Sequence, residues 1–330
     1  MLDTNKLSIE LFKFFERNRD SLSFKEKFKD DLISSYESLS DAIEEFFDKV
    51  NTLSIPFLFA LPNEGFSNFL SINDSSDKYR AGSVDGSQIE DFDYVVSTAY
   101  EFLINIGSII LDYENSSVPY HISKPRILGS NEVSELTGLD LNISRSYSKG
   151  ELIASVRTYY EYDEALLLLD MLKNRDLLLM DGGLVQWHLQ DKSLEFKEII
   201  IDKISQVLNK ADAKNIYVVG YISGSRASDV VNCLRIHNCK RNLFDCRGCS
   251  DEFCKFLDYI DDSFLFHSVF GSCTDELIAT PVFQSRARIT SIYGTPIYFF
   301  YLCNNTEFAR VEISKNSIEN VTDIAKKLHD

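Results

Sequence analysis

The sequence comprises 330 residues, of which 44% are hydrophobic, and it carries a formal net charge of −17. A chain of this length and composition buries a sizeable core, which indicates a globular protein with one large domain or one domain plus an appendage. The acidic charge excludes a protein that coats nucleic acid with a uniformly basic surface. Any contact with DNA would be local, assisted by a metal ion or delegated to a basic partner.

Neither export nor membrane insertion is expected. The first residues are polar and acidic, where a secretory signal has a basic start and then an apolar run. The most apolar stretch, residues 165–180, is interrupted by polar and charged side chains, whereas a membrane-spanning helix needs about 20 consecutive apolar residues. We therefore expect a cytoplasmic protein with no membrane contact.

The N-terminal part of the chain shows helical periodicity. Apolar residues recur at helical spacing from Leu7 to about Leu53, which predicts two amphipathic helices. These helices could pack on the main domain or form a docking or dimerisation surface, and periodicity does not separate the two. Residues 71–82 are polar and rich in turn formers, so we expect an N-terminal helical region at 1–75 and a main domain at 76–330.

The main domain alternates strands and helices. Short strands are predicted at 81–89 and 176–183, with one or two more within 93–115. The remaining predictions are helices at 149–173, 194–214, 228–238 and 317–329, a strand at 215–223, and an antiparallel pair at 297–305 and 307–314. This order indicates an α/β protein with a mixed sheet flanked by helices and an antiparallel portion.

Two apolar segments of the main domain run into Asp-Gly pairs, at Asp85 and at Asp181. Asp-Gly alone is a common turn signal, because Asp tolerates tight turns and Gly adopts positive φ. Two carboxylates at the ends of buried strands are more informative, since each costs several kcal/mol to desolvate unless it is paired or binds a cation. Together, the two aspartates indicate ligands of a cation.

A predicted helix between these two segments adds a third acid. Arg157 and Glu161 are four residues apart, which could be only a surface ion pair of about 0.2–0.5 kcal/mol. Glu161 also shares a helix face with apolar residues and can point towards the sheet. Two strand-borne Asp and one helix-borne Glu could hold one or two divalent ions, and such oxygen ligands suit Mg²⁺ or Mn²⁺.

The order of these motifs resembles the NurA nuclease family. VDGS is followed by R-x-x-x-E on a helix and, about twenty residues later, by an apolar strand ending in DGGL. The segments NIYVVGYIS, YFFYL and ARVEI agree with the bacterial and cyanobacterial branch, so the resemblance spans Tyr79 to Asp330.

The resemblance implies an RNase H-like fold with Asp85, Glu161 and Asp181 as catalytic metal ligands. It further implies a homodimer, Mn²⁺-dependent cleavage of single- and double-stranded DNA with 5′ to 3′ resection during double-strand break repair, and a hexameric HerA ATPase partner. The family usually continues into a segment with a histidine ligand, which this sequence lacks. The alternative is a catalytically weak RNase H-like module or dimeric scaffold that binds and regulates an ATPase partner.

Five of the seven cysteines fall between Cys233 and Cys254, within a predicted insertion of the nuclease domain. An odd number of cysteines in an intracellular chain argues against a disulfide framework. The cluster could hold zinc or an iron-sulfur cluster, or it could be a loop of unlinked thiols or contain a local disulfide. The candidate ligands are Cys239, Cys246, Cys249 and Cys254.

Three arginines are candidates for contacts with DNA. Arg226 is predicted between a strand and a helix N-terminus, where a phosphate could bind. Arg286 and Arg288 alternate on a predicted strand and could line a basic channel. Solvated side chains without such a role explain all three equally well.

Overall fold

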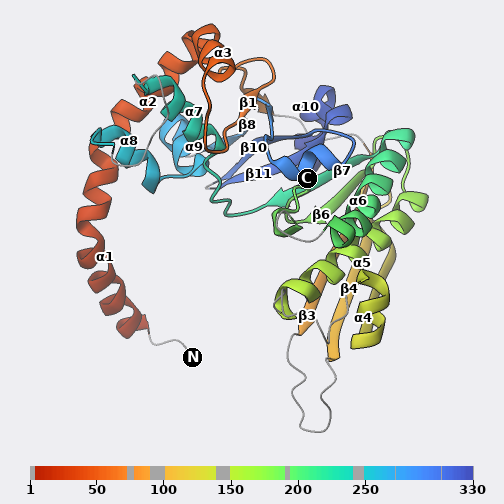
Figure 1. Ribbon diagram of the computed structural model, residues 1–330. Helices are drawn as coiled ribbons and strands as arrows, with labels where there is room; N and C mark the ends of the chain where they lie inside the picture. The colour runs from red at the N-terminus through yellow and green to blue at the C-terminus, as the bar shows by residue number, and fades with distance from the viewer. Residues whose placement is uncertain are drawn as a thin grey trace. The chain divides into compact units, whose positions relative to one another are not determined.

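The computed structural model describes residues 4–72, 78–89, 101–138, 149–189, 194–240, 249–271, 273–305 and 307–329 (Figure 1). The chain forms two compact units. Unit 1 comprises Met1–Ala60, Gly65–Ser67 and Ser225–Ser272, and unit 2 comprises Leu61–Glu64, Asn68–Gly224 and Cys273–Asp330. None of the helices in the described ranges combines the length and apolar character that a membrane span requires.

Unit 1 is helical. Its helices are α1 (Thr4–Lys27), α2 (Lys29–Asp41), α3 (Ile43–Thr52), α7 (Asp229–Asn238), α8 (Glu252–Phe256) and α9 (Asp262–Phe270). Aromatic rings fill its core: Phe28 stacks on Phe256 at 5.2 Å, and the Tyr36 hydroxyl donates to the carbonyl of Phe66 at 2.6 Å. Unit 1 thus contains both the expected N-terminal helices and the cysteine-bearing part of the chain.

The prediction of two N-terminal helices is wrong, because the segment is divided into three. The backbone leaves helical geometry at Phe28 (φ −104°, ψ 6°) and at Ala42 (φ −106°, ψ 37°), which lie between the helices. Neither residue is a Gly or Pro, so the sequence carries no local signal for these breaks.

Unit 2 is built on one mixed sheet, in which eleven strands are described. Their order is β1-β9-β10-β11-β7-β6-β3-β4-β5, with β2 paired to β8 and β8 paired to β10. β3, β6 and β7 are parallel neighbours, and the other pairs are antiparallel. The strands are β1 (Leu61–Pro62), β2 (Leu70–Ile72), β3 (Arg80–Ile89), β4 (Glu101–Asp112), β5 (Ser117–Gly129), β6 (Leu177–Asp181), β7 (Tyr217–Ile222), β8 (Cys273–Ala279), β9 (Phe283–Gln284), β10 (Ile297–Asn305) and β11 (Glu307–Ser314).

Helices pack on both faces of this sheet. α5 (Lys149–Met171) and α6 (Leu194–Lys214) bury one face with the apolar side chains of β4, including Ile104 and Ile106. α10 (Val321–His329) buries the other through Val321 and Ile324 against β7, β10 and β11. Short α4 (Ser130–Thr137) follows β5 (Figure 1). The predicted α/β class with a mixed sheet flanked by helices is confirmed.

Most predicted elements of unit 2 are found, including the antiparallel β10–β11 pair. The last helix begins later than predicted, at Val321, because Lys315–Asn320 forms a 3₁₀ helix. β5 was not predicted: it is an edge strand with Pro119 and Pro125, and its mostly exposed residues lack strand alternation. β8 was not predicted either.

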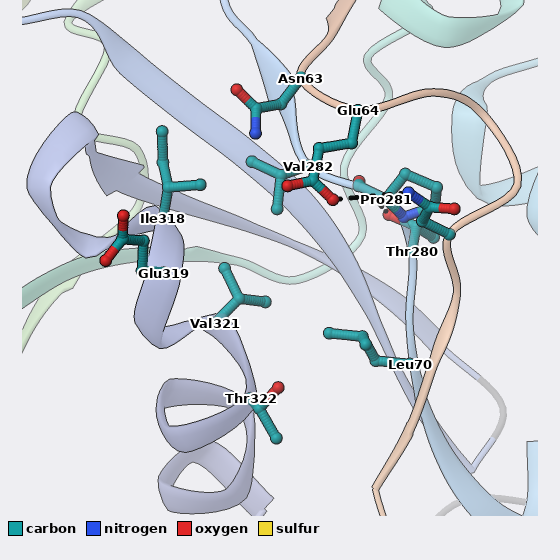
Figure 2. Close-up of a pocket in the computed structure, with 11 residues that line it drawn as sticks. Asn63, Glu64, Leu70, Thr280, Pro281, Val282, Ile318, Glu319, Val321 and Thr322 are labelled. Atoms are coloured by element: carbon teal, nitrogen blue, oxygen red, sulfur yellow. Dashed lines mark hydrogen bonds between the residues drawn. The ribbon is translucent and has the colours of Figure 1, made fainter.

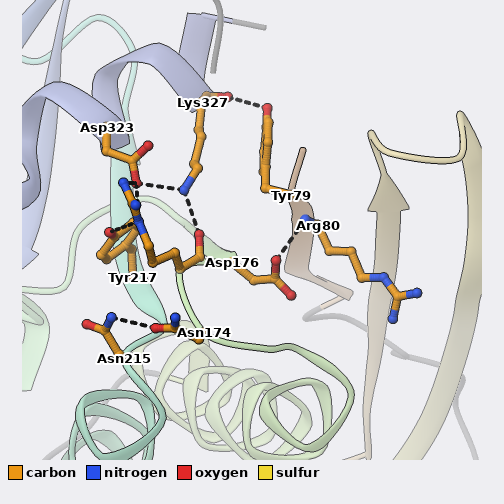
Figure 3. A network of polar contacts seen from close by, with 9 residues as sticks. Tyr79, Arg80, Asn174, Asp176, Asn215, Tyr217, Asp323 and Lys327 are labelled. Atoms are coloured by element: carbon orange, nitrogen blue, oxygen red, sulfur yellow. Dashed lines mark hydrogen bonds and ion pairs between the residues drawn. The ribbon is translucent and has the colours of Figure 1, made fainter. Parts of the chain in front are cut away.

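A polar network fixes the starts of β3, β6 and β7 to α10 (Figure 3). The buried Lys327 ammonium donates to the carbonyl of Arg175 at 2.6 Å and to Asp323 Oδ2 at 2.7 Å. The Tyr79 hydroxyl donates to the Lys327 carbonyl, and the backbone N–H of Arg80, the first residue of β3, donates to an Asp176 carboxylate at 2.9 Å. These contacts set the register of the parallel strands at the end opposite the acidic residues described next.

Candidate functional site

Asp85 and Asp181 lie side by side on neighbouring strands. The parallel register pairs Val84 of β3 with Met180 of β6, so the next residue of each strand is an aspartate. Neighbouring strands are about 4.8 Å apart and residues in register point to the same face. Both side chains are exposed. Partial burial, and next the negative charge of Asp181, raise the pKa of Asp85, as expected for two adjacent carboxylates.

The turn that an Asp-Gly pair commonly signals is not found at Asp85, because β3 continues to Ile89 along β4, as the predicted strand at 81–89 indicated. At Asp181 the strand does end, and Gly182 adopts φ +79° in the turn that follows. The two Asp-Gly pairs therefore have different structural reasons for their glycines.

A pocket of about 410 Å³ opens over the two aspartates. The register continues from Asp181 to Tyr221 of β7, so three strands contribute to its floor. Burial, followed by the charge of Glu307, raises the pKa of the Tyr221 hydroxyl. The full lining is Ser83, Asp85, Leu179, Met180, Asp181, Tyr221 and Leu328.

Glu161 approaches this pair from α5, because Gly86 leaves room for it. A Cβ at Gly86 would overlap Glu161 Oε1 and would come 2.7 Å from Cγ of Arg157. The Glu161 carboxylate is largely buried, with 14% of the side chain exposed, and lies 3.1 Å from Arg157 Nε. The Nε–H is not aligned for a hydrogen bond, so the contact is electrostatic.

Burial raises the pKa of Glu161 to about 7, and Asp85 and Asp181 add to this shift while Arg157 opposes it. The positive charge of the Arg157 guanidinium is thus too small to offset the negative charges of the three neighbouring carboxylates. Such a cluster has a negative potential that a divalent cation would relieve.

The donor set fits a hard divalent cation through its chemistry. All three predicted acids offer carboxylate oxygens and none offers sulfur or nitrogen, the combination typical of Mg²⁺ or Mn²⁺ sites. Within the described residues, no three His, Cys, Asp or Glu side chains already surround a common point as they do in a loaded metal site. Side-chain rotation would accompany binding.

Glu312 holds the loop that follows Asp181, and sequence reasoning missed it. Its buried Oε2 accepts from the backbone N–H of Val185 at 2.9 Å, and its Oε1 accepts from Arg310 Nε at 2.9 Å. A Cβ at Gly183 would come 2.9 Å from the same carboxylate, so the loop backbone lies directly against it. The available signal was a charged pair, R-x-E, inside an otherwise apolar strand.

Glu164, one turn after Glu161, shows what a structural carboxylate looks like in this protein. It is buried and accepts from Ser108 Oγ at 2.8 Å, from the Tyr120 hydroxyl at 3.1 Å and from the Lys124 ammonium. Burial acts to raise the pKa of Glu164, but these hydrogen bonds hold it below its ordinary value. The pKa of Glu164 is therefore lowered by its partners within the fold, whereas the pKa of Glu161 is raised.

A second pocket, of about 230 Å³, lies between the segment leading to β2 and the start of α10 (Figure 2). Glu64 and Glu319 are among its polar groups, and Asn68 donates to Glu64 at 3.4 Å. Apolar side chains such as Leu70 and Ile318 supply much of the wall. None of the predicted site residues lines it.

Arg286 and Arg288 do not line the pocket that contains Asp85 and Asp181. Arg286 and Arg288 are exposed and line an open pocket of about 660 Å³. The strand predicted for them is wrong: β9 ends at Gln284, and Arg288 begins a 3₁₀ helix that extends to Ile292. Arg226 is exposed in the connection between β7 and α7 and belongs to unit 1.

Of the candidate metal-binding cysteines, Cys239, Cys249 and Cys254 are free and partly buried, and Cys246 lies outside the described residues. Burial, with smaller contributions from Asp251 and Cys249, raises the pKa of Cys254 to about 12. Cys303 on β10 is disulfide-bonded, although the odd number of cysteines argued against a disulfide framework.

A protein-family model described as the NurA domain matches residues 13–329. Among solved structures, the NurA nuclease from Sulfolobus solfataricus is 13% identical, with a TM-score of 0.48 over 89% of this chain and 85% of that chain. The catalytic domain of human Endonuclease V is 13% identical, with a TM-score of 0.32 over 88% and 87%. Bacillus subtilis Endonuclease V is 11% identical, with a TM-score of 0.33 over 88% and 82%. No curated protein matches the chain.

Proposed function

Because the chain belongs to the NurA family, as its sequence motifs predicted, we propose that it is a metal-dependent nuclease that hydrolyses DNA at Asp85, Glu161 and Asp181. The observation that carries the proposal is the pairing of Asp85 with Asp181 in one open pocket, with Glu161 close enough for their charges to raise its pKa. The two aspartates are adjacent in strand register, and Glu161 is buried with its pKa raised to about 7. Such an arrangement is costly to fold without a cation and is typical of functional sites.

Asp85, Asp181 and Glu161 would hold Mn²⁺ or Mg²⁺. When bound, divalent ions of this kind activate a water for in-line attack on the phosphodiester and stabilise the leaving 3′ oxygen. Two further side chains of the protein would position the acids. Arg157 holds Glu161 toward the strands, and Glu312 fixes the turn after Asp181 through the Val185 N–H.

Cleavage of 5′-labelled single- and double-stranded DNA in Mn²⁺ tests the proposal, with Asp181→Asn compared with the wild-type chain. The matched control is Asp163→Asn, which changes a carboxylate on α5 whose partner is Lys203 at 2.6 Å. Activity should fall at least 100-fold in Asp181→Asn and stay within twofold in the control. Equal activity in all three preparations would reject this site. No activity in any of them, with either metal ion, would favour a module that regulates an ATPase.

We propose that Arg286, Arg288 and Arg226 bind phosphates of the DNA. The support is their exposure and, for Arg286 and Arg288, their place in one open pocket. Replacing a phosphate-binding arginine by Ala should weaken DNA binding for all sequences and reduce the slope of affinity against salt by about one. An unchanged salt slope would remove that residue from the interface.

Family membership also supports a role in cytoplasmic DNA double-strand break repair. We propose a homodimer that acts with a HerA-like hexameric ATPase in 5′ to 3′ end resection. Light scattering on the full chain tests the dimer. Cleavage of an end-labelled duplex with and without the ATPase tests polarity and partnership, because resection from the other end would contradict this assignment.

We further propose that Cys239, Cys246, Cys249 and Cys254 bind zinc or an iron-sulfur cluster, which would stabilise their segment within a nuclease domain at 76–330. The support is their spacing and the free, partly buried state of the described members. Elemental analysis and the visible absorption spectrum of the purified protein would distinguish zinc, iron and no metal.

A further inference from the structure

The sheet face that carries Asp85 continues across β4 and β5 as a shelf of small polar residues. Strand register places Asp85 beside Gly107 of β4 and Gly107 beside Ser123 of β5. Two positions further along the strands, the same face carries Ser87 and Asn105. Asp85, Ser87 and Ser123 are exposed and the other two are half-buried, so no described element packs over this part of the sheet.

Gly107 makes the shelf flat next to the acids, and the fold does not require a glycine there. Among the described residues, and apart from its chain neighbours, an ideal Cβ at Gly107 has only the Asp85 carbonyl oxygen within 4 Å, at 3.7 Å, which is ordinary van der Waals contact. Its φ is not in the left-handed region. A glycine in a strand interior weakens the strand and often marks a close approach by a ligand or another backbone.

The shelf offers hydrogen-bond donors rather than charges. Ser123 Oγ donates to Asn105 Oδ1 at 2.8 Å, which occupies the amide oxygen and leaves the amide N–H groups as the donors at this point. Hydroxyl and amide groups of this kind commonly bind phosphate and sugar oxygens of DNA. Four positions from Asp85 the same face becomes apolar, with Ile89 and Ile127 52% and 71% exposed.

We propose that a single-stranded segment of the DNA substrate lies across this shelf, with its backbone closest to the protein at Gly107. The inference rests on the proposed nuclease function and extends it to the path of the strand. Polar rows beside the acids contact the sugar-phosphate backbone. The apolar row at Ile89 and Ile127 contacts unpaired bases, whose faces a duplex would hide. From Asp181 to Ser123 the row crosses four strands, or about 14 Å at about 4.8 Å per strand.

The test compares wild type with Gly107→Ala and Gly107→Val, and with Ser117→Val as the control. Ser117 is also on β5 but pairs with Asp112, about 17 Å along the strands from the Asp85 row at about 3.3 Å per residue. Binding of a fluorescent single-stranded oligonucleotide is measured with Ca²⁺ replacing Mn²⁺, and cleavage with Mn²⁺. Thermal unfolding and direct Mn²⁺ titration accompany both.

We expect Gly107→Val to weaken oligonucleotide binding and to lower kcat/KM at least tenfold, with a smaller loss for Gly107→Ala. The melting temperature should be equal or higher, and the Mn²⁺ affinity should stay within twofold. The proposal would be overturned if Gly107→Val bound and cleaved DNA like the wild type, or if it lost Mn²⁺ affinity in parallel with DNA binding. It would also be overturned if Ser117→Val lost as much DNA binding as Gly107→Val, or if the loss of binding were confined to duplex DNA. A wild-type chain that binds DNA without cleaving it would contradict the nuclease function alone, and the binding comparison would still decide the path.

Discussion

Replacing Glu161 by Gln should stabilise the metal-free protein at neutral and alkaline pH. Burial raises the pKa of this carboxyl from 4.5 to about 7 in the folded chain. Below pH 4.5 it is protonated in folded and unfolded chains alike. Between pH 4.5 and 7 the unfolded chain releases the proton and the folded chain keeps it, so the free energy of unfolding falls as the pH rises. The full shift corresponds to about 3 kcal/mol at about 1.36 kcal/mol per pH unit.

Thermal unfolding in EDTA at pH 4.5 to 8.5 measures this effect. The wild type should lose stability relative to Glu161→Gln through this window, and the gap at pH 8 should reach roughly 6–12 °C in melting temperature at about 2–4 °C per kcal/mol. At pH 4.5 the two should agree. The control Asp163→Asn removes a more exposed carboxylate and should show no gap that widens with pH.

Divalent ions provide the second half of this test. Mn²⁺ requires the ionised carboxylates, so it should raise the melting temperature of the wild type more at pH 8 than at pH 5.5, and much less in Glu161→Gln. Parallel pH curves for wild type and variant would refute the assignment of Glu161 as an uncompensated buried acid. An equal Mn²⁺ response in both would exclude it as a ligand.

Three further changes test the residues around the acids. Gly86→Ala introduces a Cβ that overlaps the Glu161 carboxylate, so cleavage assays should show a loss of at least 100-fold, with about 1–3 kcal/mol of destabilisation in urea unfolding. Glu312→Gln leaves a buried arginine without its carboxylate and should cost about 3 kcal/mol or more in the same unfolding assay. Lys124→Met removes the cation that holds down the pKa of Glu164; unfolding measured at several pH values should show a stability loss at pH 8 that shrinks as the pH falls through the folded pKa of that carboxyl.

The sequence predicted the two aspartates because their signal is local. Each aspartate follows apolar residues within a predicted strand and precedes a glycine, and both features are visible in the sequence. The parallel register that places Asp85 beside Asp181 is a feature of the structure, because it depends on how β3 pairs with β6. Local signals also located α5, α6 and the β10–β11 pair, whose periodicities are long and regular.

The remaining features depend on contacts that are distant in sequence. Glu312 lies far from Val185 along the chain, and its role arises only because β11 pairs with β7 beside the turn after Asp181. Gly107 lies beside Asp85 only because of the register between β3 and β4. β5 lacks a buried face along most of its length, so its residues show neither alternation nor an apolar run. No periodicity within one segment contains this information.

Glu161 and Glu164 show that packing, rather than residue type, separates the acid proposed for the site from a structural one. Both lie on α5, one turn apart, and both are withdrawn from solvent, so the sequence alone does not distinguish their roles. Glu164 meets a lysine and two hydroxyls on β4 and β5 and ionises readily. Glu161 meets one arginine and two further carboxylates, and its pKa rises instead. Burial of an acid near other acids is unfavourable in the ionised form, and this supports the proposal that Glu161 binds a cation.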